Sequence, residues 1–255
     1  MKITSIALDK AVSDGPIDAF SHVLLSDAPT LDEVLGCLAL LHVADPRHRY
    51  LCTLDDVGQC RYTSMHASDN ERIALSEDED PATPEDALAA RERLLAHVVA
   101  QLEHSTHRLE WTALAGTLMC SDEDIEALVA ANATPDLIVD DVVCVQQVPV
   151  TRDDLLIAAL PNGYFSADWD LFQNHALIRH LQQHYDYRLF GLGASWLGFQ
   201  RDRAPSPAEA SALVADLQRI YAAGTHDTWS KLAATLVSRT TLLLGYTEDF
   251  SEQLP

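Results

Sequence analysis

Residues 187–200 read YRLFGLGASWLGFQ, two short apolar runs on either side of the glycine-bearing segment GLGA at 191–194. Aromatic residues favour strands, and two such runs joined by a short glycine-containing loop are typical of a β-hairpin. We therefore predict a hairpin over residues 187–201. The same reasoning predicts a second hairpin over 49–64, around a turn at 55–58, and the segment 136–150, rich in Val and Ile, predicts a strand pair or one long strand.

Helix starts are marked four times by a capping box, a hydroxyl residue followed three positions later by a carboxylate. The hydroxyl accepts from free backbone amides of the first turn, and the carboxylate returns a bond to the cap residue. The four pairs are Thr30 with Glu33, Thr83 with Asp86, Ser121 with Asp124, and Ser206 with Glu209. Apolar residues at helical spacing predict two further helices, over 168–185 and 228–244.

The order of these elements predicts an α+β fold, with helices packed on small antiparallel sheets. Two related α-β-β-α units are one interpretation, with helix 30–43 and hairpin 49–64 matching helix 168–185 and hairpin 187–201. Chance recurrence of common cap chemistry is the other interpretation. We expect an acidic α+β unit over 1–109, a bridging helix and strands over 110–160, and a second α+β unit over 161–255, either separate or joined in one compact domain.

Charge excludes two classes of partner. The chain has 39 acidic and 17 basic residues, a formal net charge of −22. Of these, 29 acidic and 10 basic residues lie in 1–160. Nucleic acids and anionic membrane surfaces are bound through clustered Lys and Arg, so we expect neither as a partner. The acidic run Glu77–Asp80 is predicted to be a solvated loop.

No stretch approaches the roughly 20 apolar residues that span a bilayer, and the first residues hold no signal-peptide core. The expected compartment is the cytoplasm. Fourteen Arg against three Lys suggest a GC-rich bacterial genome. Five cysteines without C-x-x-C spacing predict buried reduced thiols, with a redox pair of Cys52 and Cys60 as the alternative.

Histidines supply one candidate metal site. His180 and His184 are four residues apart on the predicted helix 168–185, so they share a face and could chelate a metal ion. The string between them, Leu-Gln-Gln, lacks the glutamate of the H-E-x-x-H motif. A solvated or partly buried histidine pair is the alternative interpretation, and the sequence indicates no particular cofactor.

Residues 162–175 (NGYFSADWDLFQNH) form the second candidate site, for binding. Tyr164, Phe165 and Trp169 are interpreted either as core or as a contact surface. Asp168 and Asp170 either cap the following helix or could hold a divalent cation.

We expect a non-enzymatic, acidic protein-binding module of the immunity or inhibitor type, with a basic protein as its partner, because a large field of one sign attracts an oppositely charged surface. One alternative is a metal-dependent hydrolase built on a histidine cluster. Another is a structural subunit of a larger assembly.

Overall fold

Seven strands form one mixed sheet in the part of the chain that the computed structural model describes, residues 1–75 and 81–254. The strand order is β1-β2-β4-β3-β5-β6-β7. Neighbouring strands are antiparallel except β3 and β5, which pair in parallel at the centre. The strands are β1 (Lys2–Ser5), β2 (Ser21–Ser26), β3 (Arg49–Thr53), β4 (Val143–Val148), β5 (Arg188–Leu192), β6 (Trp196–Gln200) and β7 (Thr241–Gly245).

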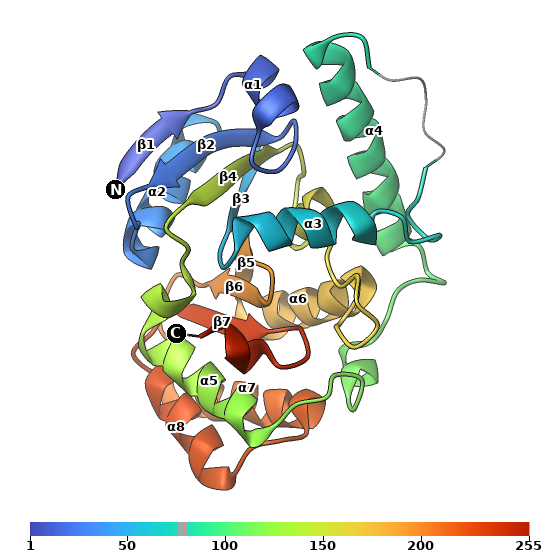
Figure 1. The fold of residues 1–255 in the computed structure, drawn as a ribbon. Helices are drawn as coiled ribbons and strands as arrows, with labels where there is room; N and C mark the ends of the chain where they lie inside the picture. Colours follow the sequence, from blue (N-terminus) through green and yellow to red (C-terminus); the bar gives the residue numbers. More distant parts are fainter. Residues whose placement is uncertain (76–80, 255) are drawn as a thin grey trace.

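Helices surround this sheet, as Figure 1 shows. Helix α3 crosses in front of the central strands, α4 stands along one side, and α5, α7 and α8 gather beyond β7. The α-helices are α1 (Leu8–Asp14), α2 (Leu31–Ala44), α3 (Val57–Ala67), α4 (Pro84–Glu103), α5 (Asp122–Ala133), α6 (Leu171–Tyr185), α7 (Pro207–Tyr221) and α8 (His226–Leu236).

The central strands are buried along almost their whole length. In β3, the residues from Tyr50 to Thr53 are all buried, and so are Leu189 to Leu192 of β5. Because successive side chains point to opposite faces of a sheet, burial of every residue means that both faces are covered. The core therefore lies on both sides of the β3–β5 pair.

The predicted helix caps are confirmed. Full capping boxes begin α2, α4, α5 and α7 at Thr30, Thr83, Ser121 and Ser206. The helix predicted over 168–185 begins at Leu171, because Asp170 is its cap and accepts from the backbone nitrogens of Phe172 and Gln173. These caps are local chemistry, so the sequence alone locates them.

The hairpin at 187–201 is confirmed as β5 and β6, but the hairpin at 49–64 is wrong. β3 is followed by helix α3, capped by Asp56, whose side chain accepts from the backbone nitrogen of Gln59. Its buried residues, Cys60, Thr63, Ser64 and Ala67, follow helical spacing. The thiol of Cys60 lies 3.7 Å from the carbonyl oxygen of Leu192 on β5, so this face of α3 contacts the sheet.

The expected small antiparallel sheets are corrected to the single mixed sheet above, an α+β architecture. The two-unit repeat is not confirmed, because helix α3 replaces the second strand of the first unit. The helix predicted over 228–244 is α8 followed by the buried strand β7, and the segment 136–150 holds a short 3-10 helix and one strand, β4. The predicted loop Glu77–Asp80 lies outside the described residues.

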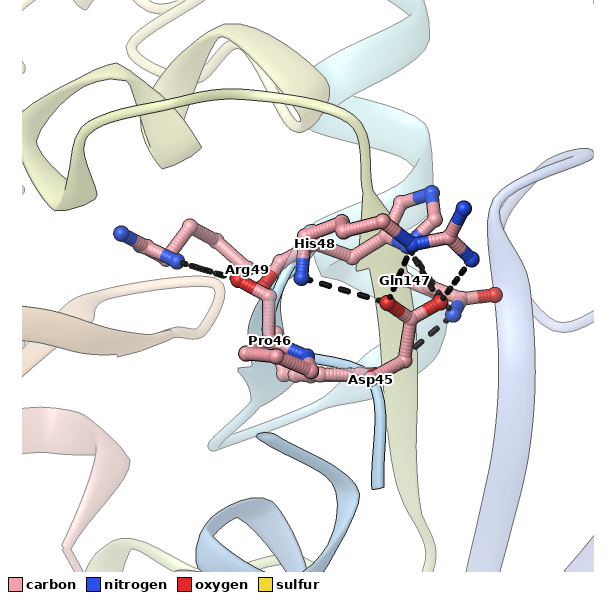
Figure 2. Close-up of polar contacts among 7 residues, drawn as sticks. Asp45, Pro46, His48, Arg49 and Gln147 are labelled. Carbon is pink, nitrogen blue, oxygen red and sulfur yellow. Dashed lines mark hydrogen bonds and ion pairs between the residues drawn. The ribbon is translucent and has the colours of Figure 1, made fainter. Parts of the chain in front are cut away.

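A polar cluster fixes the turn between α2 and β3 (Figure 2). The carboxylate of Asp45 lies 2.9 Å from Nδ1 of His48 and 3.0 Å from Nε of Arg47. The Arg47 guanidinium holds the pKa of the Asp45 carboxyl below its usual range. The amide nitrogen of Gln147 on β4 lies 3.4 Å from the same His48 nitrogen and donates to the hydroxyl of Tyr50 at 3.2 Å. The turn is thereby tied to the neighbouring strand.

Among the described residues, no helix combines the length and the apolar character required to cross a bilayer.

Candidate functional site

Four aromatic rings form a continuous surface row, which we call the aromatic strip: Tyr62, His66, Tyr164 and Phe165. Ring centroids are 4.4 Å apart between Tyr62 and His66, 4.9 Å between His66 and Tyr164, and 5.2 Å between Tyr164 and Phe165. Tyr62, Tyr164 and Phe165 are 46%, 47% and 48% exposed. The strip thus joins two segments that lie about 100 residues apart in the sequence.

Helix geometry and a glycine turn place these rings together. Tyr62 and His66 are four residues apart on α3, so they share one face of the helix. The other two rings follow Gly163, which has a φ of +76°. A Cβ at this position would lie 2.1 Å from the carbonyl oxygen of Trp169. Only glycine therefore permits the turn that brings Tyr164 to His66.

A cavity of about 240 Å³ opens beside the strip, and His66 and Tyr164 line it together with Asp69, Asn162 and Asp170. Asn162 is buried, and its amide interacts with the side chain of Tyr246 without a hydrogen bond of standard geometry. A buried amide that is bonded this weakly gains free energy when a ligand or water completes it. The cavity thus has an aromatic wall, two carboxylates and an amide able to donate and accept.

Asp170 and Asp168 lie close to the aromatic strip, and both stabilise the local fold. Asp170 caps α6 and forms an ion pair with Arg72, whose guanidinium lies 4.0 Å from the ring centroid of Phe172. Asp168 accepts from the backbone nitrogen of Glu248 at 3.2 Å. Burial raises the pKa of the Asp168 carboxyl to about 6, and the negative charge of Glu248 acts in the same direction. The capping interpretation of Asp170 is confirmed.

Trp169 lies in the core, so of the three aromatic residues singled out in 162–175 only Tyr164 and Phe165 fit the contact-surface interpretation. The indole nitrogen of Trp169 donates to the hydroxyl of Thr117 at 2.9 Å, and its ring lies 5.3 Å from that of Tyr221. Trp169 therefore anchors the segment that carries the exposed rings. The sequence interpretation missed Tyr62 and His66, because their segment was predicted to be a strand.

The histidine pair on α6 lies elsewhere on that helix. His180 Nε2 is 2.8 Å from the carboxylate of Asp216, and the hydroxyl of Tyr185 donates to the same oxygen at 2.6 Å. The ring of His180 stacks on Trp111 with centroids 4.1 Å apart and lies 4.7 Å from the ring of His184. Burial lowers the pKa of His180 and His184 acts in the same direction, while Asp216 opposes them.

The metal site at His180 and His184 stays a prediction. In the described part of the chain, no group of three or more His, Cys, Asp and Glu side chains is arranged to hold a metal ion.

Comparison of the chain with family models, curated proteins and solved structures gives no match.

Proposed function

We propose that this protein is a protein-binding module that recognises a basic partner through the aromatic strip. The observation that carries the proposal is the continuous contact of four rings, three of them about half exposed, next to a cavity. Partly exposed Tyr and Phe side chains gain free energy when a partner covers them, and aromatic residues are enriched among the energetic centres of interfaces.

Charge supports a basic partner. Asp69, with a side chain that is 81% exposed, lies 3.8 Å from the ring of His66, and Asp170 lines the same cavity. A Lys or Arg side chain entering the cavity would meet the exposed carboxylate of Asp69 and the faces of the strip's rings, which attract cations. The carboxylate of Asp170 is already paired with Arg72. The net charge of −22 steers such a partner from a distance.

The cavity volume sets what enters it. About 240 Å³ accommodates one long side chain and is small for a typical cofactor or drug-sized ligand. The partner is therefore expected to insert a single basic residue while its surface covers Tyr62 and Phe165. Asn162, whose amide has no hydrogen bond of standard geometry, lines the cavity that would receive this residue.

The test is site-specific crosslinking in cells of the native host. A photo-crosslinking amino acid replaces Phe165 and, as a matched control, the exposed Leu40 of α2. We expect a defined adduct with a basic protein from position 165, lost when Tyr164→Ala is introduced and absent from position 40. The purified pair should dissociate more readily as salt is raised.

The same adducts from both positions, or an acidic partner from position 165, would contradict the proposal. So would salt-insensitive binding. Because Tyr164 and Phe165 are surface residues, each alanine variant should keep the melting temperature of the parent. A strongly destabilised Tyr164→Ala variant would instead assign the ring a structural role.

The metal-dependent hydrolase and the structural subunit remain alternative proposals. The hydrolase proposal has the closely spaced rings of His180 and His184 in its favour. It predicts stoichiometric metal in protein purified without chelator, and loss of that metal in His180→Ala. The subunit proposal predicts a large native assembly in which the strip is covered.

A further inference from the structure

A second cavity, of about 440 Å³, lies where α4 ends beside α6, and three arginines are among its lining residues. Arg108, Arg152 and Arg179 line it together with His175 and Gln182. Only 17 of the 255 residues are basic, and three of them meet here. Glu103 and Asp154 also line the cavity, so with His175 neutral the lining has a net charge of about +1, opposite in sign to the chain as a whole.

Arg152 is already paired. Its Nε and one terminal nitrogen donate to the two carboxylate oxygens of Asp154, both at 2.9 Å, and the other terminal nitrogen donates to Glu103 at 2.6 Å. A guanidinium held in this way by two carboxylates has little capacity for a ligand. Arg152 therefore serves to hold Asp154 in place.

Arg108 and Arg179 have no such carboxylate. One terminal nitrogen of Arg179 donates to the carbonyl of Leu109 at 2.8 Å, and its buried Nε has no partner. The guanidinium of Arg108 makes no hydrogen bond or ion pair within the described ranges. Burial lowers the pKa of Arg179, and the charge of Arg108 lowers it further, while Glu110 and Asp154 act in the opposite direction.

His175 adds an oriented ring to the same cavity. It is 4% exposed, and its Nε2 lies 3.2 Å from the carboxylate of Asp154. The side-chain oxygen of Gln182 is buried and unpaired, as is the Nε of Arg179. Two buried polar atoms around one cavity thus lack partners, which is unfavourable unless a ligand or water completes them.

We propose that this cavity binds a small oxyanion, the phosphate or carboxylate group of a metabolite, between Arg108 and Arg179 with His175 beside them. Guanidinium groups match phosphate and carboxylate oxygens with paired hydrogen bonds, and an anion relieves the repulsion between two like charges. A cavity of this volume holds a ligand with the size of a small metabolite. The cavity is separate from the aromatic strip. Evidence against the proposed function would therefore not affect this proposal, and evidence against this proposal would not affect the proposed function.

The test is calorimetric titration of the full chain with inorganic phosphate, pyrophosphate and citrate at constant ionic strength. We expect saturable binding of at least one of them, weakened about tenfold or more in Arg108→Gln and Arg179→Gln. The control Arg203→Gln removes the same charge from an exposed position paired with Glu209, and should bind as the parent does. Comparison of the affinities for phosphate and citrate distinguishes a site for phosphate groups from a site for carboxylate groups.

Arg108 is exposed, so its variant should fold even if Arg179→Gln is destabilised. The imidazole resonances of His175 should shift on binding in the parent and not in Arg108→Gln. Failure of all three anions to bind, or equal weakening in Arg108→Gln and Arg203→Gln, would overturn the proposal.

Discussion

The side chain of Asp55 accepts a hydrogen bond of 2.9 Å from the backbone nitrogen of Ser195. The parallel pair β3–β5 is short, with partners at Cys52–Gly191 and Thr53–Leu192. The backbone carbonyl of Asp55 extends the pairing by accepting from the nitrogen of Ala194 at 3.1 Å. Asp55 is 9% exposed, and its Oδ1 has no partner. The Asp55 carboxyl therefore adds one hydrogen bond to the backbone pairing of β3 with β5, and its burial makes the charged form of this carboxyl unfavourable.

This penalty predicts a pH dependence of stability. Burial raises the pKa of Asp55 to about 7, and the neighbouring charge of Asp56 acts in the same direction. The folded state then keeps a proton that the unfolded state loses above about pH 4, so stability falls as pH rises toward 7. The contribution lost between pH 5 and pH 7 is about 2 kcal/mol. Asp168, with a pKa near 6, adds a decrease in the same direction.

Asp55→Asn should therefore flatten the dependence of the free energy of unfolding on pH, measured by urea unfolding between pH 4.5 and pH 7.5. The asparagine oxygen can still accept from Ser195, so the variant should approach or exceed the parent near pH 7. Parallel curves for the two proteins would show that Asp55 does not titrate in this range.

Gly193 should be irreplaceable at the same junction. A Cβ at Gly193 would lie 1.7 Å from Oδ1 of Asp55. Gly193→Ala must therefore displace the carboxyl or the β5–β6 turn, and should lower the free energy of unfolding by about 3 kcal/mol or more. Gly36 in α2 is the matched control, because a Cβ there meets nothing within 4 Å. Gly36→Ala should stabilise the protein by about 0.5–1 kcal/mol. Equal effects in urea unfolding would contradict this account.

The sequence predicted the elements that depend on contacts between residues close in the chain. Thr30, Thr83 and Ser206 cap helices with groups three residues away, and the β5–β6 hairpin closes on itself. The joining of β3 to β5 depends on contacts between residues about 140 positions apart, such as Asp55 with Ser195. No periodicity in the sequence reports such a pairing, which is why separate sheets were expected.

Only part of the candidate site was predicted, because the sequence does not report which distant segments come together. Tyr164 and Phe165 directly follow the predicted turn at Asn162 and Gly163, so the sequence indicates them as surface candidates. Tyr62 and His66 lie beside them only because residues 57–67 form a helix, which the sequence analysis did not predict. The spacing of Cys60, Thr63, Ser64 and Ala67 carried that signal in small residues, which hydrophobic patterning underweights. Arg108 and Arg179 meet in space without any local motif.

The thiols provide a test of the core. All five cysteines are free, so the redox pair of Cys52 and Cys60 is absent from this structure, and the thiol of Cys60 lies 3.7 Å from the carbonyl of Leu192. Burial raises the pKa values of Cys120 and Cys144 to about 12 and holds those of Cys52 and Cys60 above their usual range.

Because the thiolate is the reactive form, native protein should react slowly with iodoacetamide at pH 8, with the half-buried Cys120 ahead of Cys144. Peptide mass spectrometry against time gives the order. After unfolding without reductant, all five thiols should react. A count of only three reactive thiols would show that two cysteines form a disulfide.

Asn132 should satisfy the backbone of β7, a buried strand at the edge of the sheet. β7 is the last strand of the order, and Asn132 on α5 pairs with both backbone groups of Leu243, donating to its carbonyl at 2.8 Å and accepting from its nitrogen at 2.9 Å. Removing the amide leaves both groups buried and unpaired. Asn132→Ala should therefore lower the free energy of unfolding by about 2–4 kcal/mol.

Asn132→Asp keeps the shape but places a carboxylate beside the carbonyl oxygens of Leu128 and Leu243. Its loss of stability relative to the parent should therefore be larger at pH 7 than at pH 4, where protonation restores a donor. The control is Glu126→Ala on the exposed face of α5, which should stay within about 0.5 kcal/mol of the parent. If Asn132→Ala matched that control in urea unfolding, the edge of β7 would need no side-chain partner, and packing of α5 alone would hold the strand.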